Sequence, residues 1–208
     1  MTVKLSWQGR LRAVQPRIRL LRSFDEVSHA YPGFVLRIDG FIGNDEREFT
    51  VAIGNAAQQK HGFKAGDAVK GVAVPVEVPE KEPAEYYKAS GLKVLAASAV
   101  VWEPPPWLGA PPNLATYRAR GHRRLDPEAF AASCTACIWG ADMAVEMVVD
   151  QWNPSEVQYR RETFCYGPKS CPHYRAGGNR KVPGRRGMIH VEPDEVDADA
   201  TAHRGPDD

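Results

Sequence analysis

Four cysteines, Cys134, Cys137, Cys165 and Cys171, are the residues of this chain whose type and spacing best suit chemistry. Cys134 and Cys137 form a C-x2-C pair, and Cys165 and Cys171 form a C-x5-C pair. Two pairs of thiolates that meet in space supply a tetrahedral set of sulfur ligands, which structural zinc prefers. The spacing therefore predicts one structural zinc ion bound by these four residues.

Other ligand sets fit the same residues. His173 follows Cys171 by two positions and is an alternative metal ligand in place of one thiolate. An iron–sulfur cluster is the main rival, because four cysteines suit one and Cys171-Pro172 is similar to the Cys-Pro that closes ferredoxin motifs. The cysteine spacing matches neither ferredoxin pattern. Four buried thiols without a metal are the remaining alternative.

The segment between the two pairs predicts a long β-hairpin. Met143, Val145 and Met147 alternate with polar or small residues, which is typical of a half-buried strand. A turn is expected at 153–155, where the sequence reads Asn-Pro-Ser, and a return strand follows it. This arrangement resembles a zinc ribbon, although its interval is longer than usual and its second pair is wider.

The preceding half of the chain predicts strands with one short helix. Apolar and polar residues alternate with a period of two, as in antiparallel strands with one buried face. Strands are expected at 17–21, 34–42, 48–54, 66–76 and 91–101, and a helix at 55–63. This order is that of an OB-fold, a five-stranded Greek-key barrel that often binds oligonucleotides. Another small barrel or a sandwich is the alternative.

The fold class that follows is mainly β, and four regions are expected. They are an OB-like five-stranded barrel (1–102), a Pro-rich and then basic linker (103–124), a zinc-ribbon-like metal-stapled hairpin with a basic extension (125–191), and a disordered acidic tail (192–208). The tail holds seven acids and one base, so the rest of the chain has an excess of positive charge. A basic body favours polyanionic partners.

Basic residues gather after the predicted return strand, where they indicate contacts to nucleic-acid phosphates. These residues are Arg160, Arg161, Lys169, Arg175, Arg180, Lys181, Arg185 and Arg186. The aromatic residues among them, Phe164, Tyr166 and Tyr174, are candidates for base stacking or for a small core around the cysteines. On the predicted barrel, alternation places Arg17, Arg19, Arg37, Phe41, Lys70 and Lys93 outward, and Arg37 with Phe41 completes the candidate interface.

Several other classes are not favoured. The sequence contains no G-x-S-x-G, H-E-x-x-H, P-loop or Rossmann motif, so an enzyme is not the expected class. No signal peptide or long apolar stretch is present, which predicts a cytoplasmic protein without a membrane partner. The expected function is that of a non-enzymatic accessory protein that binds single-stranded nucleic acid or structured RNA. A module for protein interaction or assembly is the alternative.

Two resemblances accompany these expectations. The segments FCYGPKSCPHYRAGG and RKVPGRRG resemble a signature of uncharacterised bacterial proteins, and that resemblance implies no specific function. The pairing of a barrel with a ribbon is also similar to acyl-CoA-associated proteins that join a rubredoxin-like ribbon to an OB-fold. In those proteins the ribbon comes first and the cysteine spacing differs. This resemblance implies a metabolic role as a further alternative.

Overall fold

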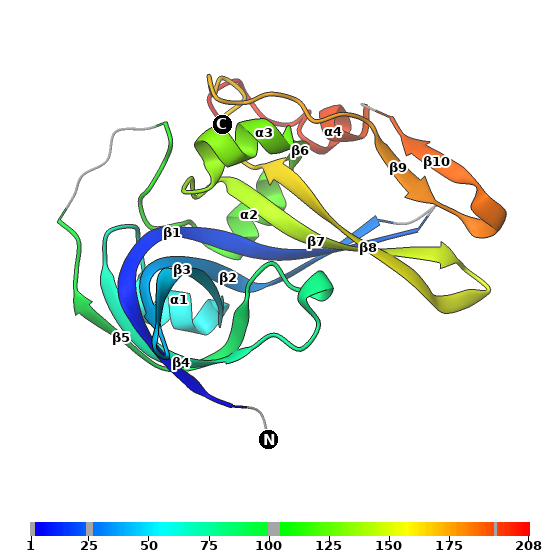
Figure 1. Cartoon of the computed structure of the whole chain (residues 1–208). Coiled ribbons are helices and arrows are strands. Elements are labelled where there is room, and N and C mark those ends of the chain that lie inside the picture. Colours follow the sequence, from blue (N-terminus) through cyan, green and yellow to red (C-terminus); the bar gives the residue numbers. More distant parts are fainter. Residues whose placement is uncertain (1–2, 24–26, 100–104, 194) are drawn as a thin grey trace.

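The computed structural model of the protein describes residues 3–23, 27–99, 105–193 and 195–208, and it is mainly β (Figure 1). The strands are β1 (Leu5–Arg22), β2 (Val27–Ile42), β3 (Asp45–Gly54), β4 (Ala68–Pro75), β5 (Tyr86–Ala96), β6 (Arg123–Arg124), β7 (Gly140–Asp150), β8 (Asn153–Cys165), β9 (Arg180–Pro183) and β10 (Ile189–Glu192). The helices are α1 (Asn55–His61), α2 (Leu114–Arg120), α3 (Pro127–Ala129) and α4 (Glu195–Ala200), with single turns η1 (Pro79–Lys81), η2 (Phe130–Cys134) and η3 (Arg185–Gly187).

Five strands close into a ring in the order β1-β2-β3-β5-β4. Strand β1 pairs antiparallel with both β2 and β4, and β3 meets β5 in parallel, which closes the ring. The period-two prediction is confirmed in β2, where Phe34, Leu36 and Ile38 are buried while Asp39 and Phe41 are exposed. The inward residues form the main core because alternate side chains of every strand share the interior of the ring.

The same sheet continues beyond the ring. The last residues of β1 pair in parallel with β7, from Arg19 opposite Ala144 to Arg22 opposite Met147, and β7 pairs with β8. Met143, Val145 and Met147 belong to the same core as the ring residues. The expected hairpin is therefore present, but its apolar face packs on the first half of the chain, because burial against a large core stabilises it more than a separate small module could.

Several predicted boundaries were wrong. The hairpin turn lies at Gln151 and Trp152, two residues before the expected 153–155, because the Asp150 carboxylate accepts a hydrogen bond from the Trp152 backbone N–H at 2.9 Å. The fifth strand is β5, which begins and ends earlier than the predicted 91–101; residues 100 and 101 lie outside the described ranges. Helix α1 ends as predicted, with Gly62 in the left-handed region (φ 59°).

The acidic tail is ordered, which corrects the expectation of disorder. Helix α4 forms within it, and the Asp197 carboxylate pairs with the buried Arg124 guanidinium at 3.1 Å. Further along, Arg204 is buried and Ser170 binds the Asp207 carboxylate at 3.0 Å. The composition indicated a solvated segment, but its acids find buried bases in the body of the protein. Among the described residues, no helix is long and apolar enough to span a bilayer.

Candidate functional site

A hollow of about 590 Å³ lies on the five-stranded ring. Its lining comes from β1, β2, β4 and β5 and from the turn after β2, namely Ser6, Trp7, Gln8, Phe41, Gly43, Lys70, Gly71, Val72 and Gly91. We call this hollow the ring groove. It contains two of the side chains that alternation placed outward, the Phe41 ring and the Lys70 amine.

Strand register explains why these side chains meet. Gln8 of β1 lies opposite Phe41 of β2 on one side and opposite Lys70 of β4 on the other, and Lys70 lies opposite Lys93 of β5. Directly opposed residues point to the same face of a sheet. One row across four strands therefore carries an aromatic ring, an amide and two amines, and the Phe41 side chain is 43% exposed.

Gly71 is needed beneath this row. A Cβ at that position would lie 2.6 Å from Cζ2 of Trp7, whose indole is almost completely buried. The absent side chain leaves space for the indole, which packs edge-to-face on Phe49 with 6.4 Å between ring centroids. The Trp7–Gly71 contact thus gives the ring groove a rigid floor.

Most of the predicted phosphate-binding arginines are neutralised within the protein. Six of the candidates pair with a carboxylate: Arg37 with Glu48, Arg160 and Arg180 with Glu162, Arg161 with Asp142, Arg175 with Asp126, and Arg185 with Asp150. A guanidinium that already has an anionic partner gains less from binding a phosphate. Each of these six guanidinium groups therefore lies beside a carboxylate of the protein itself.

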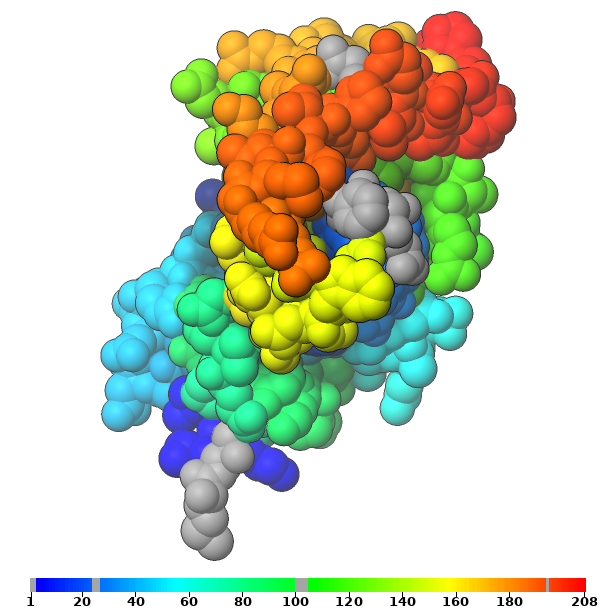
Figure 2. All heavy atoms as spheres, turned by 90° about the vertical axis from the view of Figure 1, so that its right-hand side faces the viewer, coloured from blue at the N-terminus to red at the C-terminus, as the bar shows by residue number. Residues whose placement is uncertain are grey.

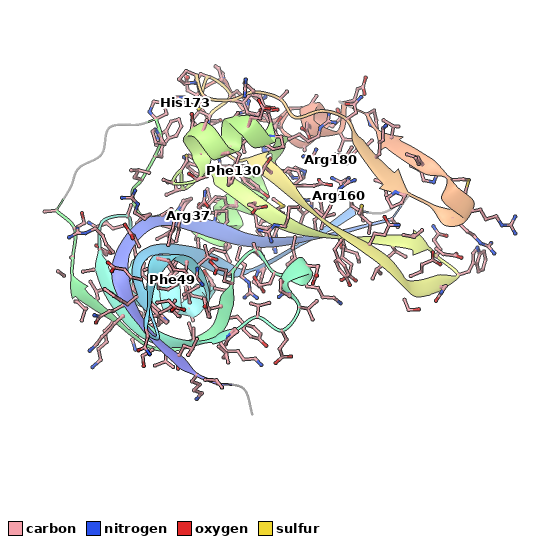
Figure 3. All side chains as sticks on the ribbon, viewed as in Figure 1. Arg37, Phe49, Phe130, Arg160, His173 and Arg180 are labelled. Atoms are coloured by element: carbon pink, nitrogen blue, oxygen red, sulfur yellow. The ribbon has the colours of Figure 1, made fainter. Side chains whose placement is uncertain are left out.

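Several arginine ion pairs share one carboxylate, that of Glu162. It is buried and accepts ion pairs from Arg160 and Arg180, whose side chains are labelled in Figure 3, and from the fully buried Arg22 at 3.4 Å. Burial lowers the pKa of Arg180 to about 10. The network joins β1, β8 and β9, so its role in this structure is to hold strands together.

The remaining candidates from the sequence are the other basic residues and the aromatic residues near the cysteines. Lys181 and Arg186 are exposed, whereas the Lys169 amine donates to the Arg204 carbonyl at 3.1 Å. Phe164 and Tyr166 are fully buried, and their packing as core residues leaves neither ring open to a base. Tyr174 is held over the Arg123 guanidinium, 3.8 Å from the ring centroid, and its hydroxyl donates to the Arg124 carbonyl.

The cysteines converge at the base of the β7–β8 hairpin. Cys134 ends η2, Cys137 precedes β7 and Cys165 ends β8, and all three are buried in one apolar cluster with Phe130 and Leu125. Cys171 is partly exposed in the loop that follows β8. The Asp126 carboxylate caps the N-terminus of α3, as its position before Pro127 predicts, and α3 with η2 delivers Cys134 to the cluster.

Hydrogen bonds fix the turns that carry the sulfurs. The buried Gln15 side chain of β1 donates to the carbonyls of Cys134 and Cys137, at 3.0 and 2.9 Å. The Gly167 backbone N–H donates to Sγ of Cys165 at 3.3 Å, and Nη2 of Arg123 lies 3.9 Å from the same sulfur. Burial raises the pKa of the Cys165 thiol, and these donors act in the opposite direction by favouring a negatively charged sulfur.

The structure does not show a formed metal site. Among the residues it describes, no three His, Cys, Asp or Glu side chains lie close enough together to hold an ion. Burial raises the pKa of Cys134 to about 12 and that of Cys137 to about 11. His173 is partly exposed near Cys171, and it is labelled in Figure 3.

Some residues of the ring groove were not predicted. Ser6, Trp7 and Gln8 belong to the first part of β1, whereas the strand predicted from the sequence started only at residue 17. The signal was present, because Leu5, Trp7 and Leu11 are apolar at alternating positions interrupted by Gly9. Comparison of the chain with protein-family models, curated proteins and solved structures finds no match.

Proposed function

We propose that the protein is a non-enzymatic nucleic-acid-binding accessory protein that holds a single strand in the ring groove. The observation that carries this proposal is the row of Phe41, Gln8, Lys70 and Lys93 across four neighbouring strands. It combines an exposed aromatic ring with two amines, and the described residues give neither amine a carboxylate partner within the row.

Each side chain of the row has a distinct part in binding. The Phe41 ring offers a stacking surface for one unpaired base, which a duplex would keep inside its own stack. The Lys70 and Lys93 amines, which follow Gln8 along the row, neutralise phosphates on one side of that base. The Gln8 amide lies between Phe41 and Lys70 and offers a donor and an acceptor to the edge of the base or to the sugar.

The connectivity supports an OB-like barrel as the frame of this site. The five-stranded ring has its short helix between the third and fourth strands, the order expected for that fold, and the parallel pairing of β3 with β5 closes it. Small barrels of this kind present a strand face to oligonucleotides. The proposed strand path runs across β2, β1 and β4.

We further propose that Cys134, Cys137, Cys165 and Cys171 bind one zinc ion. Support comes from the convergence of three of the thiols and from the N–H donors directed at the Cys165 sulfur. Side-chain movements are needed, because the described arrangement brings no three donors to one point. Zinc would neutralise the thiolates and join η2 to the base of the hairpin, giving a zinc-ribbon-like element.

Fluorescence anisotropy with labelled dT15 and rU15 tests the binding proposal. We expect Phe41→Ala to weaken binding by about fivefold or more, since loss of one base–aromatic stack costs roughly 1–3 kcal/mol. The double variant Lys70→Ala/Lys93→Ala should lower the slope of log affinity against log salt by about 1.4, because each phosphate contact to a single strand contributes about 0.7.

Lys60→Ala is the matched control, because Lys60 is an exposed lysine on α1 outside the ring groove. It should leave both the affinity and the salt slope close to those of the wild type. The proposal fails if neither oligonucleotide binds at low salt, or if the Phe41 and Lys70/Lys93 variants bind as tightly as the control.

Elemental analysis and an absorption spectrum test the metal proposal separately. We expect about one zinc per chain in a colourless protein, and Cys171→Ser should reduce both the zinc content and the midpoint of thermal unfolding. A brown protein that contains iron would establish a cluster instead. A wild-type protein with no metal would leave the cysteines as buried thiols.

A further inference from the structure

The tips of two hairpins form an exposed apolar surface on the side of the molecule away from the ring groove. Trp152, at the β7–β8 turn, is 81% exposed, and Met188 and Ile189, at the start of β10, are 55% and 62% exposed. Figure 1 shows both tips projecting from the same end of the molecule, and Figure 2 shows them in contact. We call this region, together with Val191, the tip surface.

A hollow of about 270 Å³ lies between the two hairpins. It is lined by Val148, Val149, Asp150, Gln151, Trp152, Gly184, Arg185, Met188 and His190. A hollow of this size admits one or two apolar side chains, so the tip surface has both a raised aromatic residue and a recess beside it.

The two faces of the β9–β10 sheet carry different side chains. Ile189 and Val191 lie opposite Pro183 and Lys181 of β9, and these four residues share the outward face of the two-stranded sheet. Met188 and His190 alternate with them and face the hollow. The outward face carries the apolar residues, which is the reverse of the usual pattern for a sheet exposed on one side.

The free edge of β10 provides a second, independent feature. Within the described part of the chain, β10 pairs only with β9, so one edge of its backbone lacks a strand partner. The hairpin itself is firmly held, since Val182 is 4% exposed, Arg180 is paired with Glu162, and the Gly184 N–H donates to the Met188 carbonyl at 2.7 Å. An unpaired edge on a fixed hairpin is a template for an added strand.

Positive charge lies at both ends of the apolar face formed by Ile189 and Val191. Lys181 is opposite Val191, and Arg186 lies in η3 just before Met188; both are exposed, and the described residues give neither a carboxylate partner. Arg185 is the third base, and it pairs with Asp150 at 3.2 Å. The tip surface is thus apolar at its centre and basic at its ends.

We propose that the tip surface docks an extended polypeptide segment that adds as a third strand along the edge of β10. Alternate side chains of that segment would enter the hollow beside Trp152 and cover Ile189 and Val191, because side chains of a strand alternate between faces. Acidic residues at its ends would meet Lys181 and Arg186. This docking surface is separate from the ring groove and does not depend on nucleic-acid binding there.

The observations favour a polypeptide over other polyanions or surfaces. Aliphatic side chains such as Met188, Ile189 and Val191 offer a base no stacking plane, and a lipid or nucleic acid cannot complete the hydrogen-bonding pattern of a strand edge. A recess beside an exposed tryptophan matches the pockets that receive anchor side chains at protein interfaces. A second copy of this chain would place Lys181 and Arg186 beside the same bases of its partner, which is unfavourable.

Selection from a random dodecapeptide phage library on the full-length protein tests the proposal. Recovered peptides should carry apolar residues at alternating positions and Asp or Glu toward their ends. Measured by fluorescence anisotropy as synthetic peptides, they should bind at least about tenfold more weakly to Trp152→Ser and to Ile189→Ser/Val191→Ser. The variant Lys181→Glu/Arg186→Glu should lose the preference for acidic peptides.

Two controls separate strand addition from other contacts. Leu95→Ser changes an apolar residue of β5 that is 53% exposed and distant from the tips, and it should leave peptide affinity unchanged. Two versions of a recovered peptide are compared, one N-methylated at the odd backbone positions and the other at the even positions. Only one of the two should lose binding, because a strand directs every second N–H to its neighbour.

The proposal is overturned if selection on the wild type enriches no peptide beyond selection on Trp152→Ser, or if affinity is indifferent to the tip substitutions. It is also overturned if Trp152→Ser abolishes pelleting with phosphatidylserine vesicles, binding of dT15, or self-association in sedimentation runs, while no peptide binds. Because the ring groove is unchanged in these variants, their result is independent of the Phe41→Ala experiment.

Discussion

Residues of one type have different roles here because their surroundings differ. Phe41 is exposed on the ring groove, whereas Phe164 is fully buried, although the sequence made both of them candidates for contact with a nucleic acid. Arg186 is exposed without a carboxylate partner among the described residues, whereas Arg180 is buried against Glu162. Charge and aromaticity in the sequence indicate which residues could bind a polyanion, and burial decides which of them remain available.

His29 gives a prediction for acid stability. Burial and then the nearby Arg22 guanidinium lower its pKa to about 4, while Glu192 acts in the opposite direction; its ring centroid lies 4.6 Å from that of His122, whose pKa burial also lowers. The folded protein therefore binds fewer protons than the unfolded chain between pH 6.5 and about 4. Stability present above pH 6.5 is lost as the pH falls through this window.

Urea unfolding at several pH values measures this loss. His29 alone should account for about 3 kcal/mol at most, and His29→Gln should reduce the acid-dependent loss accordingly. His61→Gln, on α1, serves as the comparison. An unchanged pH dependence in His29→Gln would show that this imidazole does not cause the effect.

Gly71 gives a prediction for the floor of the ring groove. Gly71→Val places methyl groups where Cζ2 of Trp7 lies 2.6 Å from the Cβ position, so the indole must move and the free energy of unfolding should fall by about 1–3 kcal/mol. Urea unfolding measures the change, and the emission of Trp7 should shift. Gly109→Ala, where a Cβ meets nothing within 4 Å, should have little effect.

At the scale of elements, β1 organises the molecule. It pairs with β2 from Trp7 to Arg22 and with β4 through its first residues, and its last residues also pair with β7 of the long hairpin. The segment between β4 and β5 is held to β1 by Glu82, which pairs with Arg17 and Arg19 and whose side chain is 2% exposed. This contact holds the segment that follows η1 against β1.

Glu82→Gln should destabilise the protein by about 3 kcal/mol, because it leaves the largely buried Arg17 guanidinium without its carboxylate. Thermal or urea unfolding measures the loss. Glu48→Gln is the matched control, since the Glu48–Arg37 pair is more exposed and should contribute less than about 1 kcal/mol. Equal effects of the two substitutions would contradict the burial argument.

At the scale of the whole molecule, the acidic tail packs against the region around the cysteines. The Arg204 guanidinium donates to the Gly167 carbonyl, two residues after Cys165, and the Ser170 backbone N–H donates to the Pro206 carbonyl. Asp197 neutralises the buried Arg124 of β6. The tail is therefore a structural part of this end of the molecule.

Asp197→Asn tests this arrangement. The substitution removes the anionic partner of a buried guanidinium and should lower the free energy of unfolding by about 3 kcal/mol, with faster amide exchange in α4. Asp199→Asn, an exposed residue of the same helix, should change stability by less than about 0.5 kcal/mol. A disordered tail would make the two substitutions equivalent.

The sequence by itself determined the mainly β fold, the inward residues of β2, the end of α1 at Gly62 and the helix start at Asp126. Each of these depends on local chemistry: the period of side-chain alternation, the conformational freedom of glycine, and a carboxylate beside free N–H groups. The outward placement of Phe41 and Lys70 follows from the same period.

Only the tertiary structure decided which distant residues become partners. The parallel pairing of β1 with β7, the ion pairs of Arg22 and Arg180 with Glu162 and the docking of the tail through Asp197 all join residues far apart in the sequence. Local patterns do not encode such pairings, because their energies come from shared burial and from charges that meet only after folding. The cysteine spacing predicts a metal site, but the positions of the sulfurs depend on Gln15, Gly167 and the packing around them.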